Sequence, residues 1–306
     1  MSNISPNSEH PGELGKQDAV PGRLITLFAI PKRFDGHIGL IQRNAINSWQ
    51  KLGLTVRVIL MGNESGTAEI ASELDLEHVS DLQVNELGTP LLSDAFAKAD
   101  ELADTPFIAY VNSDIILLSD FVVVMDRFLQ SQLEQFLMIG RRIDTAIDEA
   151  IDFDDPMWDI NLREMVAAQG ELAPVVCKDY FVFPKGQFAE IPAFAVGRGN
   201  WDNWMVANAN QKGMPVVDAT NVITAVHQNH DYGHVKGGRR AAYVIGREAR
   251  ANHKLAGGSN LVSGCNSTVQ IHDDGENQKL IPVESIPFWH DLPRFLGLVK
   301  SLIVQR

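Results

Sequence analysis

Blocks of apolar residues separated by polar turns predict alternating strands and helices in the first half of the chain. The strand-like runs are residues 23–30, 56–61, 77–79, 107–111 and 136–143. Helical spacing of apolar residues covers 38–52, 67–74, 90–102 and 120–129. Because this alternation is the rhythm of βαβ units, we predict an α/β fold: a mixed, mostly parallel central sheet flanked by helices in a single elaborated domain.

The second half of the chain is less regular. Residues 146–169 are expected to be mostly helical or irregular, 177–184 and 215–219 to be strands, and 202–211 to be a helix. From His227 onward the composition turns to Gly, His, Asn and basic residues. Long segments without regular structure are usually either functional or poorly ordered, so we expect one of these two here.

Composition narrows the class of protein. The chain has 306 residues, of which 45% are apolar and 21% charged, and this balance excludes general disorder and a fibrous design. Its length fits two domains or one elaborated α/β domain. The formal charge of −13 argues against a nucleic-acid partner. A protein this acidic must gather cations locally to hold a phosphorylated ligand, through a metal ion or a few placed Lys and Arg residues.

The two ends of the chain differ from its middle. Residues 1–22 are rich in Ser, Asn, Pro, Gly and charge, and we predict a disordered tail without an export signal. No apolar run has the length of a membrane span, and the two cysteines fit a reducing compartment, so we expect a cytoplasmic protein. Residues 294–306 predict a basic amphipathic helix. This helix either lies peripherally on a membrane or packs on the domain or a partner subunit of a homo-oligomer.

The segment 107–114 carries the strongest functional signal. Five apolar residues lead directly to Asn112, Ser113 and Asp114. An apolar run without alternation suits a strand that is covered on both faces, and ligands of open α/β sheets gather at the carboxyl ends of the strands. Asp114 is therefore expected where the chemistry takes place.

The sequence Asn112-Ser-Asp114 resembles the Asp-X-Asp element of nucleotide-sugar glycosyltransferases of the GT-A fold, a Rossmann-like α/β fold. In that family the element holds a divalent metal against the donor diphosphate. Here Asn112 replaces the first acid; its amide oxygen can still ligate a hard cation or bond a ribose hydroxyl, but it brings no charge. The resemblance implies Mn²⁺ or Mg²⁺ as cofactor, with binding that depends mainly on Asp114 and on ligands elsewhere.

A second resemblance lies in the segment from His230 to Lys236, which spells the His-X-X-Gly-X-X-Lys element of glycogenin-like glycosyltransferases. It implies that His230 is a metal ligand and that Lys236 contacts the diphosphate. His227 competes with His230 as the ligand, and Arg239 is expected to close over the phosphates. The alternative is that the histidines bond backbone groups in a surface loop and that Arg239 lies in a solvated turn.

The third signal is the segment 197–204, in which Asp202 stands between two tryptophans. Aromatic faces pack on sugar rings while carboxylates bond the hydroxyls. In GT-A enzymes an acid in this region commonly contacts the acceptor, and in inverting members it acts as the base, so the resemblance implies a catalytic Asp202. The alternative is a helix-capping Asp202 with two core tryptophans. Asp179, which precedes a buried strand, either faces the acceptor or supports Asp202.

The donor is expected to bind at the ends of the first strands, as the resemblance to GT-A proteins implies. Pro31 fixes the turn after the first strand, and Lys32 or Arg33 can reach phosphate there. After the second strand, Asn63 or Glu64 can bond a uracil or another base edge.

Three further residues are placed by the predicted topology. Asp94 and Asp114 are separated by one helix and one strand, which can bring both carboxylates near the donor sugar. Arg141 and Arg142 end another strand. A place in the donor site and a surface ion pair explain these two arginines equally well.

Over residues 23–240 the chain is similar to GT-A nucleotide-diphospho-sugar transferases. The similarity implies a donor-binding half at 23–145, an acceptor-binding half with the metal and diphosphate loop at 146–240, and a C-terminal extension at 241–306. The implied reaction moves a sugar from a nucleoside diphosphate sugar, with a UDP-sugar favoured, to the hydroxyl of a carbohydrate or other acceptor. Asp202 as base indicates inversion, whereas the glycogenin-like element indicates retention.

Two other functions remain compatible with these features. A sugar-phosphate nucleotidyltransferase uses a related sheet, but it normally requires a Gly-rich loop after the first strand, and residues 29–34 contain no glycine. A non-catalytic protein that binds nucleotide sugars or carbohydrates would tolerate the missing first acid.

Overall fold

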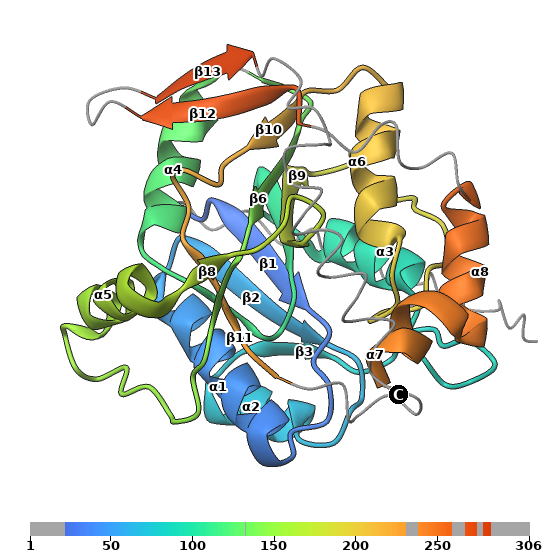
Figure 1. Cartoon of the computed structure of the whole chain (residues 1–306), viewed down its shortest axis with the longest axis horizontal. Coiled ribbons are helices and arrows are strands. Elements are labelled where there is room, and N and C mark those ends of the chain that lie inside the picture. The colour runs from blue at the N-terminus through green and yellow to red at the C-terminus, as the bar shows by residue number, and fades with distance from the viewer. Residues whose placement is uncertain (1–21, 132, 231–237, 259–266, 274–277, 283–306) are drawn as a thin grey trace, which may run out of the picture.

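The computed structural model describes residues 22–131, 133–230, 238–258, 267–273 and 278–282, which form a nine-stranded sheet with helices on both faces (Figure 1). From one edge to the other the strands are β13 (Gln278–Pro282), β12 (Val269–Asp273), β10 (Val216–Asp218), β6 (Leu137–Arg141), β9 (Lys178–Pro184), β4 (Phe107–Val111), β1 (Ile25–Ala29), β2 (Val56–Met61) and β3 (Glu77–Val79). Five of the eight neighbouring pairs are parallel, and β9 runs against both of its neighbours. The predicted α/β fold with a mixed, mostly parallel sheet is confirmed.

Helices bury both faces of this sheet. One face packs against α1 (Gly36–Lys51), α2 (Thr67–Glu73) and α4 (Asp120–Phe128), and the other packs against α3 (Leu92–Leu102) and α6 (Trp201–Gln211). Because side chains alternate along a strand, Leu27 of β1 enters the first of these cores and Phe28 enters the second. Coverage on both faces explains why the strands read as unbroken apolar runs.

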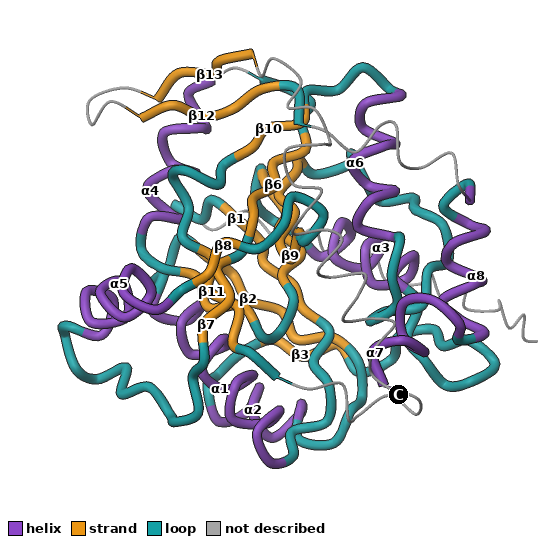
Figure 2. Tube along the Cα trace, in the orientation of Figure 1, coloured by secondary structure: helices purple, strands orange, loops and turns teal. Residues whose placement is uncertain are grey.

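A smaller sheet packs against α1, on the same face of the central sheet as α4 (Figure 2). Its order is β5 (Ile115–Leu117), β11 (Ala225–Gln228), β7 (Ile143–Thr145) and β8 (Glu171–Leu172), and α5 (Trp158–Gln169) packs on it. In β11, His227 pairs with Ile115 of β5 on one side and with Asp144 of β7 on the other. This register brings three distant parts of the chain to one place.

The small sheet corrects two sequence predictions. The loop expected from His227 onward begins later, because His227 and Gln228 belong to β11 and are buried. The single strand expected over 136–143 is two strands, since the chain leaves the central sheet after Arg141 and enters the small one at Ile143. Short strands of three or four residues do not show enough alternation to be recognised from sequence.

The C-terminal part adds to the same architecture. After α7 (Gly238–Arg240) and a π-helical turn, η2 (Ala241–Ile245), the helix α8 (Arg247–Leu255) is hydrogen-bonded to Asn85, Ala195 and Arg198, and β12 extends the central sheet from β10. The remaining element, the 3-10 turn η1 (Leu129–Ser131), follows α4. Within the described residues, no helix is long and apolar enough to cross a membrane. The amphipathic helix predicted at 294–306 and the predicted tail, except for Gly22, lie outside the described residues.

The contact between β6 and β9 leaves no space at Gly140. A Cβ atom added there would collide with the hydroxyl of Tyr180 and would lie 2.7 Å from its Cζ atom. The Tyr180 side chain is fully buried, and its hydroxyl has no hydrogen-bond partner among the described residues. The neighbouring residues 141–144 lead into the small sheet, so this packing also fixes the start of β7.

We predict that Gly140→Ala lowers the free energy of unfolding by about 1–3 kcal/mol, because the added methyl overpacks the core. Urea denaturation of the wild type and the variant measures the loss. In a Tyr180→Phe background the substitution is expected to cost less, since the hydroxyl that it meets is gone. Equal losses in the two backgrounds would contradict the collision with the hydroxyl.

Candidate metal and donor site

A cavity of about 890 Å³ opens at the carboxyl ends of β1 and β4. These two strands are parallel neighbours, so their ends lie at the same edge of the sheet, as is usual for ligand sites in open α/β folds. The residues predicted from sequence that line the cavity are Pro31, Lys32, Arg33, Glu64, Asn112, Asp114, Asp179, His227 and His230.

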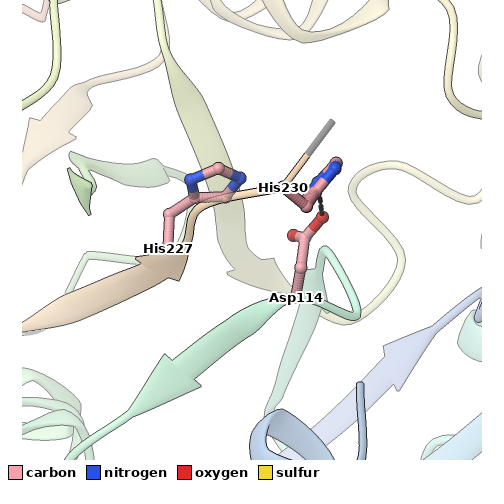
Figure 3. Close-up of side chains that lie close together, drawn as sticks. All are labelled: Asp114, His227 and His230. Atoms are coloured by element: carbon pink, nitrogen blue, oxygen red, sulfur yellow. Dashed lines mark hydrogen bonds and ion pairs between the residues drawn. The ribbon is translucent and has the colours of Figure 1, made fainter. Parts of the chain in front are cut away.

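Three of these side chains converge on one point (Figure 3). The ligand-type atoms of Asp114, His227 and His230 all lie within 4.8 Å of one another. His230 Nε2 is 3.0 Å from Asp114 Oδ2, and the other carboxylate oxygen of Asp114 is buried without a hydrogen-bond partner among the described residues. Donor atoms at about 2.0–2.3 Å from a single ion would stand at comparable separations. The geometry therefore fits a metal ion, and two imidazoles suit a transition metal better than Mg²⁺.

The charge on Asp114 is stabilised by its neighbours. Burial alone raises the pKa of this carboxyl, but Lys32, His230 and His227 outweigh burial and hold the pKa well below its usual range. Lys32 Nζ lies 3.3 Å from Asp114 Oδ2. The carboxylate is therefore ionised at neutral pH, which is the state that ligates a cation.

Gln42 of α1 fixes the two turns that form the cavity floor. Its side chain accepts a hydrogen bond from the Lys32 backbone N–H at 2.6 Å and donates one to the Lys32 carbonyl at 2.8 Å. The Ser113 hydroxyl donates to the same Gln42 oxygen at 2.9 Å. Sequence reasoning missed this residue, although the signal was present: Gln42 stands four residues after Ile38 and three before Ala45, within the apolar stripe of the helix.

A polar chain of five side chains runs along the other wall. Asn112 Nδ2 donates to Asp179 Oδ1 at 2.6 Å, and Arg142 Nη1 donates to Asp179 Oδ2 at 2.9 Å. Arg142 Nε donates to Asp144 Oδ1 at 2.8 Å, and that oxygen lies 2.8 Å from His227 Nδ1. The contact between Asp144 Oδ1 and His227 Nδ1 is short, but it does not have the geometry of a hydrogen bond. Arg142 is therefore a cavity residue that bridges two acids and not a surface ion pair.

Asp144 is also held in its charged form. Burial raises the pKa of its carboxyl, while His227 and Arg142 lower the pKa by more, so the net shift is downward. Asp144 was not among the residues expected from sequence. Only its pairing with His227 across β7 and β11 gives it a place beside the site.

The structure does not bring Asp202 to the cavity wall. Asp202 is the second residue of α6, whose N-cap is Asn200, and one of its carboxylate oxygens is buried without a hydrogen-bond partner among the described residues. Burial raises its pKa against the opposing charge of Lys178. Trp201 is a core residue, whereas Trp204 is partly buried and packs against the same core. Trp201 packs on Tyr110 and Phe181, and Trp204 on Phe194.

Two donor candidates lie elsewhere. Asp94 accepts a hydrogen bond from the Gln83 backbone N–H at 2.8 Å and forms an ion pair with Lys98 at 3.2 Å, and it does not line the cavity. After β2, Glu64 lines the cavity whereas Asn63 does not. Lys236 and the side chain of Arg239 lie outside the described residues, so their predicted phosphate contacts stay predictions.

No protein-family model and no curated protein matches the chain. Among solved structures, it is similar to glucosyl-3-phosphoglycerate synthase from Mycobacterium tuberculosis in complex with Mn²⁺, UDP and glucosyl-3-phosphoglycerate, at 14% identity over 87% of this chain and 89% of that chain, with a TM-score of 0.45. It is also similar to S. aureus TarS 1-349, at 12% identity over 53% of this chain and 47% of that chain, with a TM-score of 0.34. At these identities and TM-scores, the likenesses assign neither fold nor activity to this chain.

The contact between Asn112 and Asp179 predicts the effect of restoring the acid that the metal motif lacks. Asn112→Asp replaces a donor to a carboxylate with a second carboxylate, so we expect a loss of about 1.5–3 kcal/mol in the free energy of unfolding at neutral pH. Two adjacent carboxylates repel each other most when both are ionised, so the loss is expected to be largest at neutral pH and to shrink as the pH falls and one acid takes up a proton.

The measurement is urea denaturation of the wild type and Asn112→Asp at pH 4 and pH 7. The gap between the two proteins should be small at pH 4 and largest at pH 7. Asn63→Asp makes the same change at an exposed position after β2 and serves as the control. A variant as stable as the wild type at pH 7 would show that the Asn112 amide is not required beside Asp179.

Proposed function

We propose that this protein is a metal-dependent glycosyltransferase that uses a nucleoside diphosphate sugar, with a UDP-sugar favoured. The observation that carries the proposal is the convergence of Asp114, His227 and His230 in a cavity at the carboxyl ends of β1 and β4. Two motifs far apart in sequence, each similar to a metal element of such enzymes, thus supply ligands to one point.

The first proposed roles are those of the metal ligands and of the basic side chains. Asp114, His227 and His230 would hold Mn²⁺, which when bound offsets the charge that develops on the departing diphosphate. Lys32 is fixed through its backbone by Gln42, and Arg33 next to it has a mostly exposed side chain, so both are placed to meet phosphate oxygens. Lys236 and Arg239 are proposed as further phosphate contacts on the motif alone.

The base and ribose of the donor would bind at the turns after β1 and β2. Pro31 and Glu64 line this side of the cavity. Asn112 commits its amide nitrogen to Asp179, which leaves its amide oxygen for a ribose hydroxyl or the cation. Asn63 and Asp94, which do not line the cavity, are not assigned donor contacts.

The acids of the acceptor side favour retention over inversion. Asp179 lines the cavity, but its two oxygens accept hydrogen bonds from Asn112 and Arg142, so it is better placed to position groups than to remove a proton. Asp202 does not line the cavity. Since neither acid stands as a free base, we favour the retaining outcome that the glycogenin-like element implies.

Incubation with Mn²⁺ and a panel of nucleotide sugars tests the proposal. Release of a nucleoside diphosphate, dependent on the metal and increased by a carbohydrate acceptor, supports sugar transfer. Formation of a nucleoside triphosphate from pyrophosphate would identify a sugar-phosphate nucleotidyltransferase instead. Binding of a nucleotide sugar without turnover would identify a non-catalytic protein.

We predict that Asp114→Asn lowers the turnover of the nucleotide sugar at least about 100-fold, because the ligand set loses its only carboxylate charge, and even outer contacts of metal sites are worth 10- to 100-fold. Nucleoside diphosphate release at saturating Mn²⁺ measures the effect. Asp154→Asn, at a side chain that is 96% exposed, is the control and should turn over like the wild type. Unchanged turnover in Asp114→Asn would refute the central assignment.

A further inference from the structure

Asp144 stands behind His227 on the side away from Asp114. We propose that Asp144 is a positioning residue that orients the His227 imidazole for the cation, and that Arg142 holds Asp144 in place. This inference rests on the proposed metal site and adds to it two residues that neither motif contains.

The strand register places Asp144 beside His227. β7 and β11 are parallel, and Asp144 and His227 are direct partners in their register. Side chains of paired residues project from the same face of a sheet and lie side by side. The strand register therefore places the two side chains beside each other, where His227 Nδ1 and Asp144 Oδ1 lie 2.8 Å apart.

The chemistry of the imidazole favours the same role for Asp144. A carboxylate 2.8 Å from Nδ1 favours the tautomer that carries its proton on Nδ1. The lone pair then stays on Nε2, the other ring nitrogen, which is left for a cation. A metal-bound histidine almost always donates its other ring N–H to such a partner, and this fixes both the tautomer and the orientation of the ring.

Asp144 is itself held in place by Arg142. Arg142 donates one hydrogen bond to Asp144 and another to Asp179, and the Arg142 side chain is only 14% exposed. Asp179 in turn accepts from Asn112, one of the two polar positions of the motif that ends β4. The two sides of the proposed site are thus joined by one guanidinium, whose planar fork suits two carboxylates at fixed directions.

The competing explanation is purely structural. In that case Arg142 and Asp144 would only fasten β7 to β9, and their removal would lower stability without changing the imidazole. A denaturation curve alone does not separate these explanations. The tautomer of His227 and the affinity for the ion do.

The experiment compares wild type, Asp144→Asn and Arg142→Lys in two measurements. Free Mn²⁺, followed by its EPR signal during a titration of the protein without nucleotide, gives the metal affinity. We expect Asp144→Asn to weaken it about 10- to 100-fold. Arg142→Lys keeps the charge but loses the fork, and we expect a smaller loss. Asp148→Asn, an exposed acid four residues further along the chain, is the matched control and should bind like the wild type.

The second measurement is independent of metal. The ¹⁵N NMR spectrum of the histidine rings, with His227 assigned by substitution, reports which nitrogen carries the proton. We expect the Nδ1–H form in the wild type and a shift toward the Nε2–H form in Asp144→Asn, because an amide can donate to Nδ1. This readout remains available for any variant that folds.

The outcomes separate this inference from the proposed function. If the wild type binds Mn²⁺ and Asp144→Asn binds it equally well with His227 in the same tautomer, the role of Asp144 is refuted and the metal site stands. If the wild type does not bind Mn²⁺, the proposed metal site fails and this inference fails with it. A weaker Mn²⁺ affinity together with the changed tautomer supports both.

Discussion

The position of β11 between β5 and β7 is the constraint on which the candidate site depends. Its register sets His227 opposite Ile115, the residue after Asp114, and opposite Asp144 on the other side. Because strand side chains alternate with a period of two, a slip of one residue would turn His227 to the other face of the small sheet. Strand pairing is therefore the first cause of the proximity of Asp114 and the two histidines, and the side-chain conformations come second.

Buried amides hold that register. Gln228, the last residue of β11, is fully buried; its side chain donates to the Ile41 carbonyl at 2.7 Å and accepts from Asn44 at 3.0 Å. Gln42 joins the turns after β1 and β4 in the same way. These groups on α1 and β11 would cost free energy if they were left unpaired in the interior, so they favour one arrangement of strands over its neighbours.

Much of the fold could be predicted from the sequence because both faces of the central sheet are covered. β1, β2 and β4 read as apolar runs and the helices between them as periodic stripes, whereas β5, β7 and β11 are too short for either signal. Within the site, Asp114 and His230 could be predicted from motifs. Asp144 and Arg142 could not, because their role comes from pairing between strands that are distant in sequence.

The amide at position 112 is best understood through the charges around it. Arg142 already donates hydrogen bonds to the carboxylates of Asp144 and Asp179. Within this group of side chains, a third acid at position 112 would find no further cation to pair with. With Asn112 the same position donates to Asp179 and keeps the charges balanced. Lys32 balances the charge of Asp114 in the same way. A cation that binds Asp114 would therefore have to displace the Lys32 ammonium group. Affinity for the ion would then depend on the difference between two cations at one carboxylate, and a metal would have the advantage over lysine that two imidazoles can ligate it.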